Sequence, residues 1–367
     1  MKVAVITRHA IANYGSLLQA IATQRVIENL GHTCEIIDYV RDDESYSQLE
    51  RTLLKRKKDW NNNPIKRFIY LVLRQPESIS AGKRFEKARA KYLHLTRRYE
   101  TLAQLKNDVP AAEVYVTGSD QVWGPVANGS YDSSYCLSFV TDDKKKIAYA
   151  ASFGHTEMTE ALSAYYKKWL SRYEHISVRE ESAVGILNSI GLRSDQVLDP
   201  TLLLDATYWS GFITESPKGK YVLVYQLHSD KKLGKYARKV AKEKGLPLIR
   251  VSASLHQMSR EGKFVWCPDL STFLAYIKNA ECIITDSFHG TAFAINFNTP
   301  FVEVLPNNNT GTRNMSILSL TKLTEQILQD ENNIALANNT VDFSYANDVI
   351  AKMRKESIAR LKKMIGH

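Results

Sequence analysis

The chain begins MKVAVITRHAIANYGSLLQAIATQRVIENLGHTCEIIDYV (residues 1–40), and this stretch decides the expected fold. The apolar run at residues 3–7 predicts a buried strand, residues 17–30 predict a helix that ends at Gly31, and residues 35–40 predict a second strand. Apolar strands that alternate with helices are typical of a parallel sheet covered on both faces.

The same alternation recurs along the rest of the chain. Further strands are expected at residues 113–117, 146–152, 175–178 and 196–199, and then at 221–228, 248–253, 281–285 and 301–305. We therefore expect an α/β protein with two doubly wound Rossmann-like domains that face each other across a cleft. The expected domains are residues 1–205, with a basic insertion at about 41–107, and residues 206–340, followed by a helix at 341–367 that packs back on the body.

Positive charge is concentrated in the expected insertion. The 367 residues carry a net charge of +10, and residues 51–106 contain 16 Lys and Arg against 4 Asp and Glu. With the apolar run at residues 68–73, this composition fits a helical insertion with a solvated basic face, and it also fits peripheral contact with an anionic membrane surface. No nucleic-acid-binding motif accompanies the charge, so we expect no nucleic-acid partner.

Several function classes lack their sequence signals. No apolar run is long enough to span a membrane, and no signal peptide precedes the first strand, so we expect a cytoplasmic protein, or one at the inner face of the membrane if the basic segment contacts lipid. There is no dinucleotide fingerprint, P-loop or nucleophile elbow. We expect no cofactor and no metal, because the four cysteines are far apart and form no CxxC pair: Cys34, Cys136, Cys267 and Cys282.

Polar loops follow five of the expected strands. In open parallel sheets, ligands bind beyond the carboxyl ends of the strands, so these loops are expected to share the functional edges of the sheets. They comprise residues 8–16, 118–123, 153–155, 179–182 and 286–291.

Individual residues in these loops suggest chemistry. Ser287 and Gly290 suit a tight turn into a helix whose free N–H groups can hold an anion, and His289 between them can exchange a proton near neutral pH. Arg179 is a candidate ligand contact, as is Arg313, which we expect in a loop at residues 310–314. Structural roles also fit: His289 as a helix-start histidine, Arg313 as an exposed side chain.

Taken in order, the motifs resemble the polysaccharide pyruvyl transferase family. Gly124 and Ser16 depart from residues that are common in that family. The matching segments are NYGSLLQA (13–20), GSDQVW (118–123), IAYAASFG (147–154), SVREES (177–182), VLDPT (197–201), SFHG (287–290) and PFV (300–302).

The resemblance implies a fold like that of GT-B glycosyltransferases, phosphoenolpyruvate as donor, and a ketal-linked pyruvate on a sugar of an exopolysaccharide or cell-surface precursor as product. It matches His289 and Arg179 to family positions associated with the donor site and catalysis. We expect catalysis by His289, Arg179 and Asp120. Donor binding is expected from Arg179, Ser287, His289, Gly290, Thr291 and Arg313, and acceptor binding from Asn13, Tyr14 and Trp123.

Two other functions remain open at this point: a nucleotide-sugar glycosyltransferase of the same architecture, and a non-catalytic anion- or glycan-binding protein. Asp120 also fits a simple turn, and Trp123 also fits the core. The acceptor sugar, its bridged hydroxyl pair, its lipid or nucleotide link, and the oligomeric state are likewise open.

Overall fold

The computed structural model describes residues 1–126, 129–306 and 311–366. The chain forms two compact units: unit 1 is Met1–Pro200 with Ser357–His367, and unit 2 is Thr201–Glu356. Each unit is built around one parallel sheet, of seven strands in unit 1 and five in unit 2.

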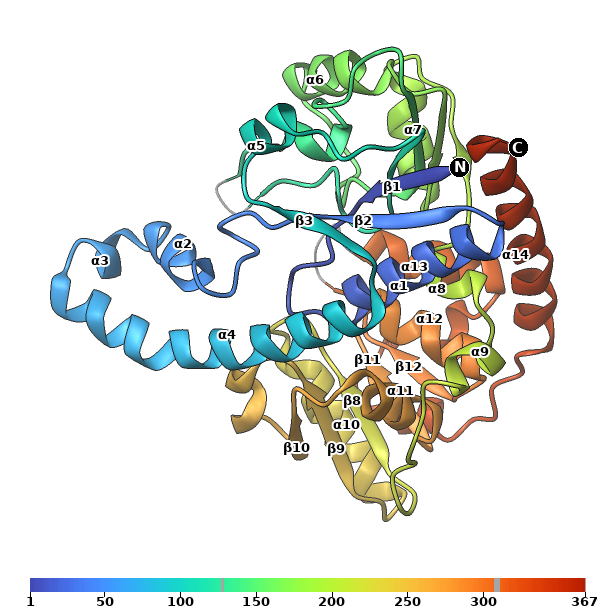
Figure 1. Cartoon of the computed structure of the whole chain (residues 1–367). Helices are drawn as coiled ribbons and strands as arrows, with labels where there is room; N and C mark the ends of the chain where they lie inside the picture. Colours follow the sequence, from blue (N-terminus) through green and yellow to red (C-terminus); the bar gives the residue numbers. More distant parts are fainter. Residues whose placement is uncertain (127–128, 307–310, 367) are drawn as a thin grey trace. The chain divides into compact units, whose positions relative to one another are not determined.

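The sheet of unit 1 reverses its direction of growth at β1 (Figure 1). The strand order is β3-β2-β1-β4-β5-β6-β7, so the chain first builds outward through β2 and β3 and then resumes on the other side of β1. The carboxyl ends of β1 and β4 therefore flank the switch point at which ligands bind in such sheets. The strands are β1 (Lys2–Ile6), β2 (Thr33–Tyr39), β3 (Leu95–Tyr99), β4 (Val114–Thr117), β5 (Lys145–Ala151), β6 (His175–Val178) and β7 (Asp195–Gln196).

Helices of unit 1 begin where side-chain caps satisfy their first N–H groups. Asn13 caps α1, because its Oδ1 accepts a hydrogen bond from the Gly15 N–H at 2.8 Å. Thr159 caps α6 in the same way through the Leu162 N–H. The helices are α1 (Tyr14–Asn29), α2 (Leu49–Lys55), α3 (Lys58–Asn61), α4 (Pro64–Tyr92), α5 (Leu102–Asn107), α6 (Glu160–Leu170), α7 (Glu181–Ser189) and, at the junction of the units, α8 (Pro200–Leu203).

The basic insertion is a helical hairpin whose longest member is α4. Asn63 caps α4 and Pro64 occupies its first turn, while Pro76 lies in its interior. The second half is anchored to the start of α1 and to the loop after β1: the Phe85 ring lies 5.0 Å from that of Tyr14, and Arg89 Nη1 donates to the Ala10 carbonyl at 3.0 Å. The first half and the short helices α2 and α3 lie away from the strands of their own unit (Figure 1).

Unit 2 repeats the doubly wound plan on a smaller scale. Its strand order is β10-β9-β8-β11-β12, so the switch point lies between β8 and β11. Its strands are β8 (Val222–Tyr225), β9 (Leu248–Ser252), β10 (Lys263–Trp266), β11 (Cys282–Thr285) and β12 (Phe301–Glu303), and its helices are α9 (Ala206–Ser210), α10 (Lys231–Glu243), α11 (Leu270–Lys278), α12 (Phe288–Phe297) and α13 (Gly311–Thr321).

Helix α14 (Ser344–Ile365) supplies its last turns to unit 1. Leu361 and Met364 are buried, and the Leu198 N–H donates to Ser357 Oγ at 3.2 Å. The strand expected at 196–199 is shorter: β7 is only Asp195–Gln196, because its partner β6 ends at Val178, which pairs with Gln196.

The expected fold class is confirmed, since both sheets are parallel and doubly wound. Among the described residues, none of the helices combines the length and apolar character that crossing a lipid bilayer requires.

Gly82 is a point of close contact between α4 and the preceding loop. A Cβ at this position would lie 2.2 Å from Tyr46 Cβ, which cannot swing away as a side-chain tip can. Gly82→Ala should therefore lower the free energy of unfolding by about 1–3 kcal/mol in urea titrations. Gly185→Ala in α7 is the matched control: no atom lies within 4 Å of its Cβ, so stability should stay equal or rise. Equal stability of the two variants would contradict this packing.

Candidate functional site

Arg179 organises the carboxyl edge of the unit 1 sheet. It follows β6, only 4% of its surface is exposed, and its Nη1 donates to Asp199 Oδ2 at 2.8 Å. Two further carboxylates lie near the same guanidinium. Glu180 is 3.6 Å from its Nε, and Asp120 is 3.9 Å from its Nη2. Burial acts to lower the pKa of Arg179, but these carboxylates outweigh it and raise the pKa above its ordinary value, so the guanidinium stays charged.

Asp120 lies at the switch point of unit 1, beyond the end of β4. Its φ is +73°, a left-handed conformation that Asp tolerates better than most residues. Its Oδ2 accepts from Ser16 Oγ at 2.5 Å, which joins it to the start of α1, and its Oδ1 accepts from the Gln121 N–H at 2.8 Å. The strained backbone and the two donors fix the carboxylate in place.

Hydroxyl groups hold the neighbouring loops in register. Thr7 Oγ1 donates to the Ser119 carbonyl at 2.8 Å, which connects the loop after β1 to the loop after β4. Ser119 Oγ donates to Asp199 at 2.9 Å, and Ser152 Oγ donates to Glu180 at 2.6 Å. Loops after β1, β4, β5 and β6 therefore converge on the carboxylates that surround Arg179.

In unit 2, the corresponding edge is formed by the start of α12. Ser287 caps this helix by accepting from the Gly290 N–H at 3.3 Å, and His289 lies in the first turn with 6% of its surface exposed. Gly290 leaves no space for a side chain: a Cβ would lie 2.5 Å from Thr285 Oγ1 and 3.0 Å from the Tyr225 ring. The start of α12 therefore packs directly on β8 and β11.

A buried hydrogen-bond chain continues from this helix to β12. Thr291 Oγ1 contacts the Ser287 carbonyl at 3.1 Å and also the Glu303 carboxyl group, while Asn314 Nδ2 donates to the other Glu303 oxygen at 2.6 Å. Burial raises the pKa of Glu303 to about 8. A neutral Glu303 fits the geometry: its proton is donated to Thr291, whose own proton is donated to the Ser287 carbonyl, which can only accept.

Asp286 ties the two central strands of unit 2 together. Its carboxylate accepts from the Leu227 N–H at 2.7 Å and from the His228 N–H at 3.0 Å, both in the loop after β8. Buried Arg250 supports the same loop, because its Nη1 donates to Gln226 Oε1 at 2.9 Å, and burial lowers its pKa to about 10.

The expected acceptor residues are mostly enclosed. Asn13 uses its side chain to cap α1, and Tyr14 is 2% exposed against Phe85. Trp123 is 1% exposed, and its indole N–H donates to the Tyr135 carbonyl at 3.3 Å. In this conformation, all three side chains stabilise loops.

Arg313 lies in helix α13, and the expectation of a loop at residues 310–314 is wrong for Gly311–Asn314. Buried Asn314, bound to Glu303, accounts for the helix at this position because it fixes the first turn. Thr310 lies outside the described residues.

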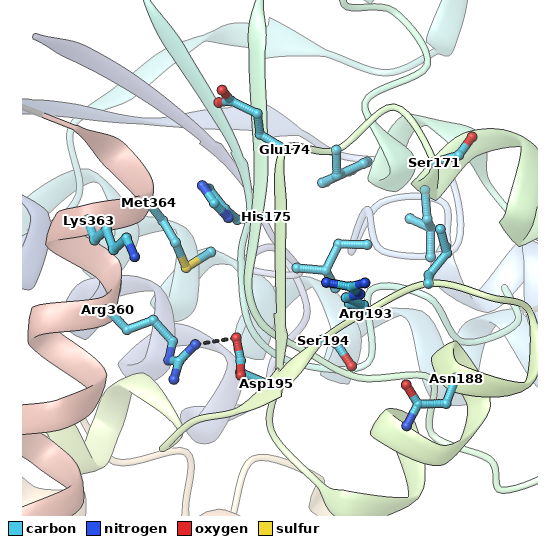
Figure 2. Close-up of a pocket in the computed structure, with 14 residues that line it drawn as sticks. Ser171, Glu174, His175, Asn188, Arg193, Ser194, Asp195, Arg360, Lys363 and Met364 are labelled. Carbon is cyan, nitrogen blue, oxygen red and sulfur yellow. Dashed lines mark hydrogen bonds and ion pairs between the residues drawn. The ribbon is translucent and has the colours of Figure 1, made fainter.

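Hollows lie at opposite edges of the unit 1 sheet. One of about 830 Å³ lies at the carboxyl edge beyond β2 and β3, and its lining includes Arg41, Lys55, Arg56, Thr101 and Tyr131. The other, of about 630 Å³, lies at the amino ends of β6 and β7 (Figure 2). In Figure 2 its Asp195 pairs with Arg360 of α14. Ligands bind at carboxyl edges in such sheets, so the first hollow is the better placed of the two, although neither Arg179 nor Asp120 lines it.

The structure brings together, within unit 1, Arg179 and Asp120, and, within unit 2, the residues from Ser287 to Thr291. Sequence reasoning missed the carboxylates that hold them: Asp199, Asp286 and Glu303. Asp199 lies in the quoted VLDPT segment and Asp286 directly precedes SFHG, so a signal existed for both. Among the described residues, no cluster of three or more His, Cys, Asp or Glu side chains is placed to hold a metal ion.

Comparisons with known proteins agree with this picture. A family model described as polysaccharide pyruvyl transferase matches residues 13–309. No curated protein matches the sequence. Among solved structures, the chain is similar to a UDP-N-acetylglucosamine 2-epimerase from Listeria monocytogenes at 10% identity and a TM-score of 0.50, with 98% of this chain and 94% of that chain covered. It is similar to UDP-bound MnaA of S. aureus at 10% identity and a TM-score of 0.50, covering 100% and 92%. At these identities, the likeness shows the fold alone.

The raised pKa of Glu303 predicts a pH-dependent stability. The folded chain holds a proton on Glu303 between its unfolded pKa of about 4.3 and its folded value, and the unfolded chain does not, so stability must fall as pH rises through this window. Glu303→Gln removes this titration. Between about pH 6 and about pH 8, the wild type should lose on the order of 2 kcal/mol of unfolding free energy relative to the variant. Parallel pH profiles in urea denaturation would contradict a neutral Glu303.

Proposed function

Because the chain belongs to the polysaccharide pyruvyl transferase family, we propose that it transfers pyruvate from phosphoenolpyruvate to two hydroxyl groups of a sugar in an exopolysaccharide or cell-surface precursor. The family match over residues 13–309 carries this proposal. The polar carboxyl edges of both sheets support it, since they concentrate an imidazole, a guanidinium and several carboxylates where such sheets bind ligands.

The reaction requires a balanced movement of two protons. One proton adds to the methylene carbon of phosphoenolpyruvate, and the first sugar hydroxyl forms a C–O bond to the neighbouring carbon. Phosphate then leaves with the former enol oxygen, and the second hydroxyl closes the ketal. Of the two hydroxyl protons released, one replaces the proton delivered to carbon and the other leaves with phosphate.

The donor is a compact anion, so positive groups and N–H donors must bind it. We assign this role to the start of α12, where Ser287, Gly290 and Thr291 shape the first turn, with Arg313 on α13 as a further cation. Arg179 is assigned to the donor as well: the guanidinium would exchange its Asp120 contact, which at 3.9 Å is the longest of the three, for the anion, while Asp120 stays in place.

His289 is assigned as the acid that protonates the donor carbon or the departing phosphate, and Asp120 as the base that accepts a hydroxyl proton. The Glu303–Thr291–Ser287 chain holds the first turn of α12, so we assign Glu303 the role of positioning His289. No step of this scheme assigns a role to a metal ion or cofactor.

Incubation with phosphoenolpyruvate and a panel of sugar acceptors tests the function. The expected product is an acceptor with a pyruvate ketal, formed together with free phosphate. His289→Ala should lower kcat by about 10²- to 10⁴-fold. Arg179→Ala should raise the KM for phosphoenolpyruvate by at least about tenfold. Exposed His256 and Arg238 supply the matched alanine controls, with unchanged constants.

Other outcomes separate the rival functions. Transfer of labelled sugar from a nucleotide sugar, with no labelled pyruvate in the product, would identify a glycosyltransferase. Donor binding without phosphate release would identify a binding protein. Full activity of His289→Ala would remove the acid assignment, and a loss of kcat at unchanged KM in Arg179→Ala would assign Arg179 to positioning Asp120.

We propose that the acceptor enters the hollow beyond β2 and β3, since the expected acceptor side chains Tyr14 and Trp123 are buried. Lys55 and Arg56 line this hollow and are exposed, so they suit the diphosphate that both lipid-linked and nucleotide-linked sugars carry.

The double variant Lys55→Ala/Arg56→Ala should raise the KM for a diphosphate-linked acceptor by about tenfold or more and leave the KM for the free sugar unchanged. Lys362→Ala/Lys363→Ala removes an adjacent exposed pair at the other end of unit 1 and is the control. An equal effect on linked and free sugars would contradict diphosphate recognition.

A further inference from the structure

The first half of α4 exposes an apolar stripe. Its members follow the i, i+3, i+4, i+7, i+8 spacing that places side chains on one face of a helix. Their exposed fractions, from 44% to 71%, are far above those of core residues. The stripe consists of Ile65 (69%), Phe68 (68%), Ile69 (44%), Val72 (53%) and Leu73 (71%).

This stripe is not the face by which α4 packs on its own hairpin. That face carries Tyr70, which is 8% exposed, donates to Glu50 Oε2 at 2.9 Å and lies against the Trp60 ring at 6.2 Å. Tyr70 lies about 130° around the helix from the centre of the stripe. Helices α2 and α3 therefore cover one side of α4 and leave the stripe on the other.

The second half of the same face is basic. Eighteen residues make five turns of an α-helix, so a residue lies directly in line with the one eighteen positions earlier. Lys83 is therefore in line with Ile65, Lys87 with Ile69, and Lys91 with Leu73. All three lysines are exposed, as is Arg84 beside them. One face of α4 thus changes along its length from apolar to basic.

We propose that this face of α4 is a docking surface for an anionic lipid bilayer. The apolar stripe would enter the boundary between headgroups and acyl chains while the lysines contact lipid phosphates, as in amphipathic helices that lie on membranes. Charge favours lipid over a second copy of the chain, because the segment 51–106 holds 16 Lys and Arg against 4 Asp and Glu and would repel its own copy. The proposal is independent of the transferase activity.

Sedimentation of the full chain with lipid vesicles tests this surface. The chain should bind vesicles that contain phosphatidylglycerol and bind pure phosphatidylcholine vesicles much less. High salt should weaken the binding, because it screens the lysines. Circular dichroism of each variant verifies that it is folded.

Two double variants separate the halves of the face. Phe68→Gln/Leu73→Gln should lower the vesicle partition coefficient about a hundredfold, because the variant lacks two large apolar side chains that would transfer from water into the bilayer. Lys83→Gln/Lys87→Gln should lower it about 25-fold on phosphatidylglycerol vesicles. Met258→Gln, at a site 61% exposed, and Lys235→Gln/Lys239→Gln, an exposed pair with the same spacing, should bind as the wild type does.

The proposal is overturned if the wild type binds neither kind of vesicle, or if the Phe68→Gln/Leu73→Gln variant binds as well as the wild type. It is also overturned if analytical ultracentrifugation shows an oligomer that this variant converts to monomer, because the stripe would then be an interface between copies.

Discussion

The buried ion pair between Arg179 and Asp199 holds the candidate site of unit 1 together. A guanidinium with 4% exposure is tolerated only when carboxylates and hydrogen bonds replace the water it has lost. Asp199 meets this need and is itself fixed by Ser119, in the loop after β4. Removal of either charge would leave the other buried and uncompensated. The loops of three strands therefore depend on one electrostatic contact, which explains why so many polar side chains fit inside a sheet edge.

Sequence patterns predicted most strands of the parallel sheets because buried strands leave a plain signal. They missed β3, inside the expected insertion, and β10, since both are partly exposed edge strands. The apolar runs of β1, β4, β8 and β11 are continuous and end at turn residues, so their type and order were evident. The residues at which strands and helices begin and end were harder to predict. The strand expected at 196–199 stops where its partner β6 ends, and the Leu198 N–H donates to a helix about 160 residues away, which no local pattern contains. Arg313 was expected in a loop because Gly311 and Thr312 suggest one, yet they begin a helix.

The candidate site was predictable in its loops but not in its electrostatics. The polar segments after β4, β6 and β11 could be placed at sheet edges from topology alone. Glu303 could not, because a carboxylate at the end of a three-residue strand resembles any surface acid until Thr291 and Asn314 are seen to enclose it. Residue type likewise does not reveal burial. Tyr14 and Trp123 were expected to bind the acceptor sugar, and both side chains are buried.

Pro76 removes one backbone hydrogen bond from the middle of α4. A proline has no N–H to donate, so the Val72 carbonyl lacks its usual partner one turn earlier and the helix bends most easily there. The interruption falls between the apolar stripe and the lysines, while Arg89 and Phe85 fasten the far end to the loop after β1. Glu50 of α2 accepts from Tyr70 before the proline and from Ser78 after it, so one carboxylate braces the helix across the missing hydrogen bond.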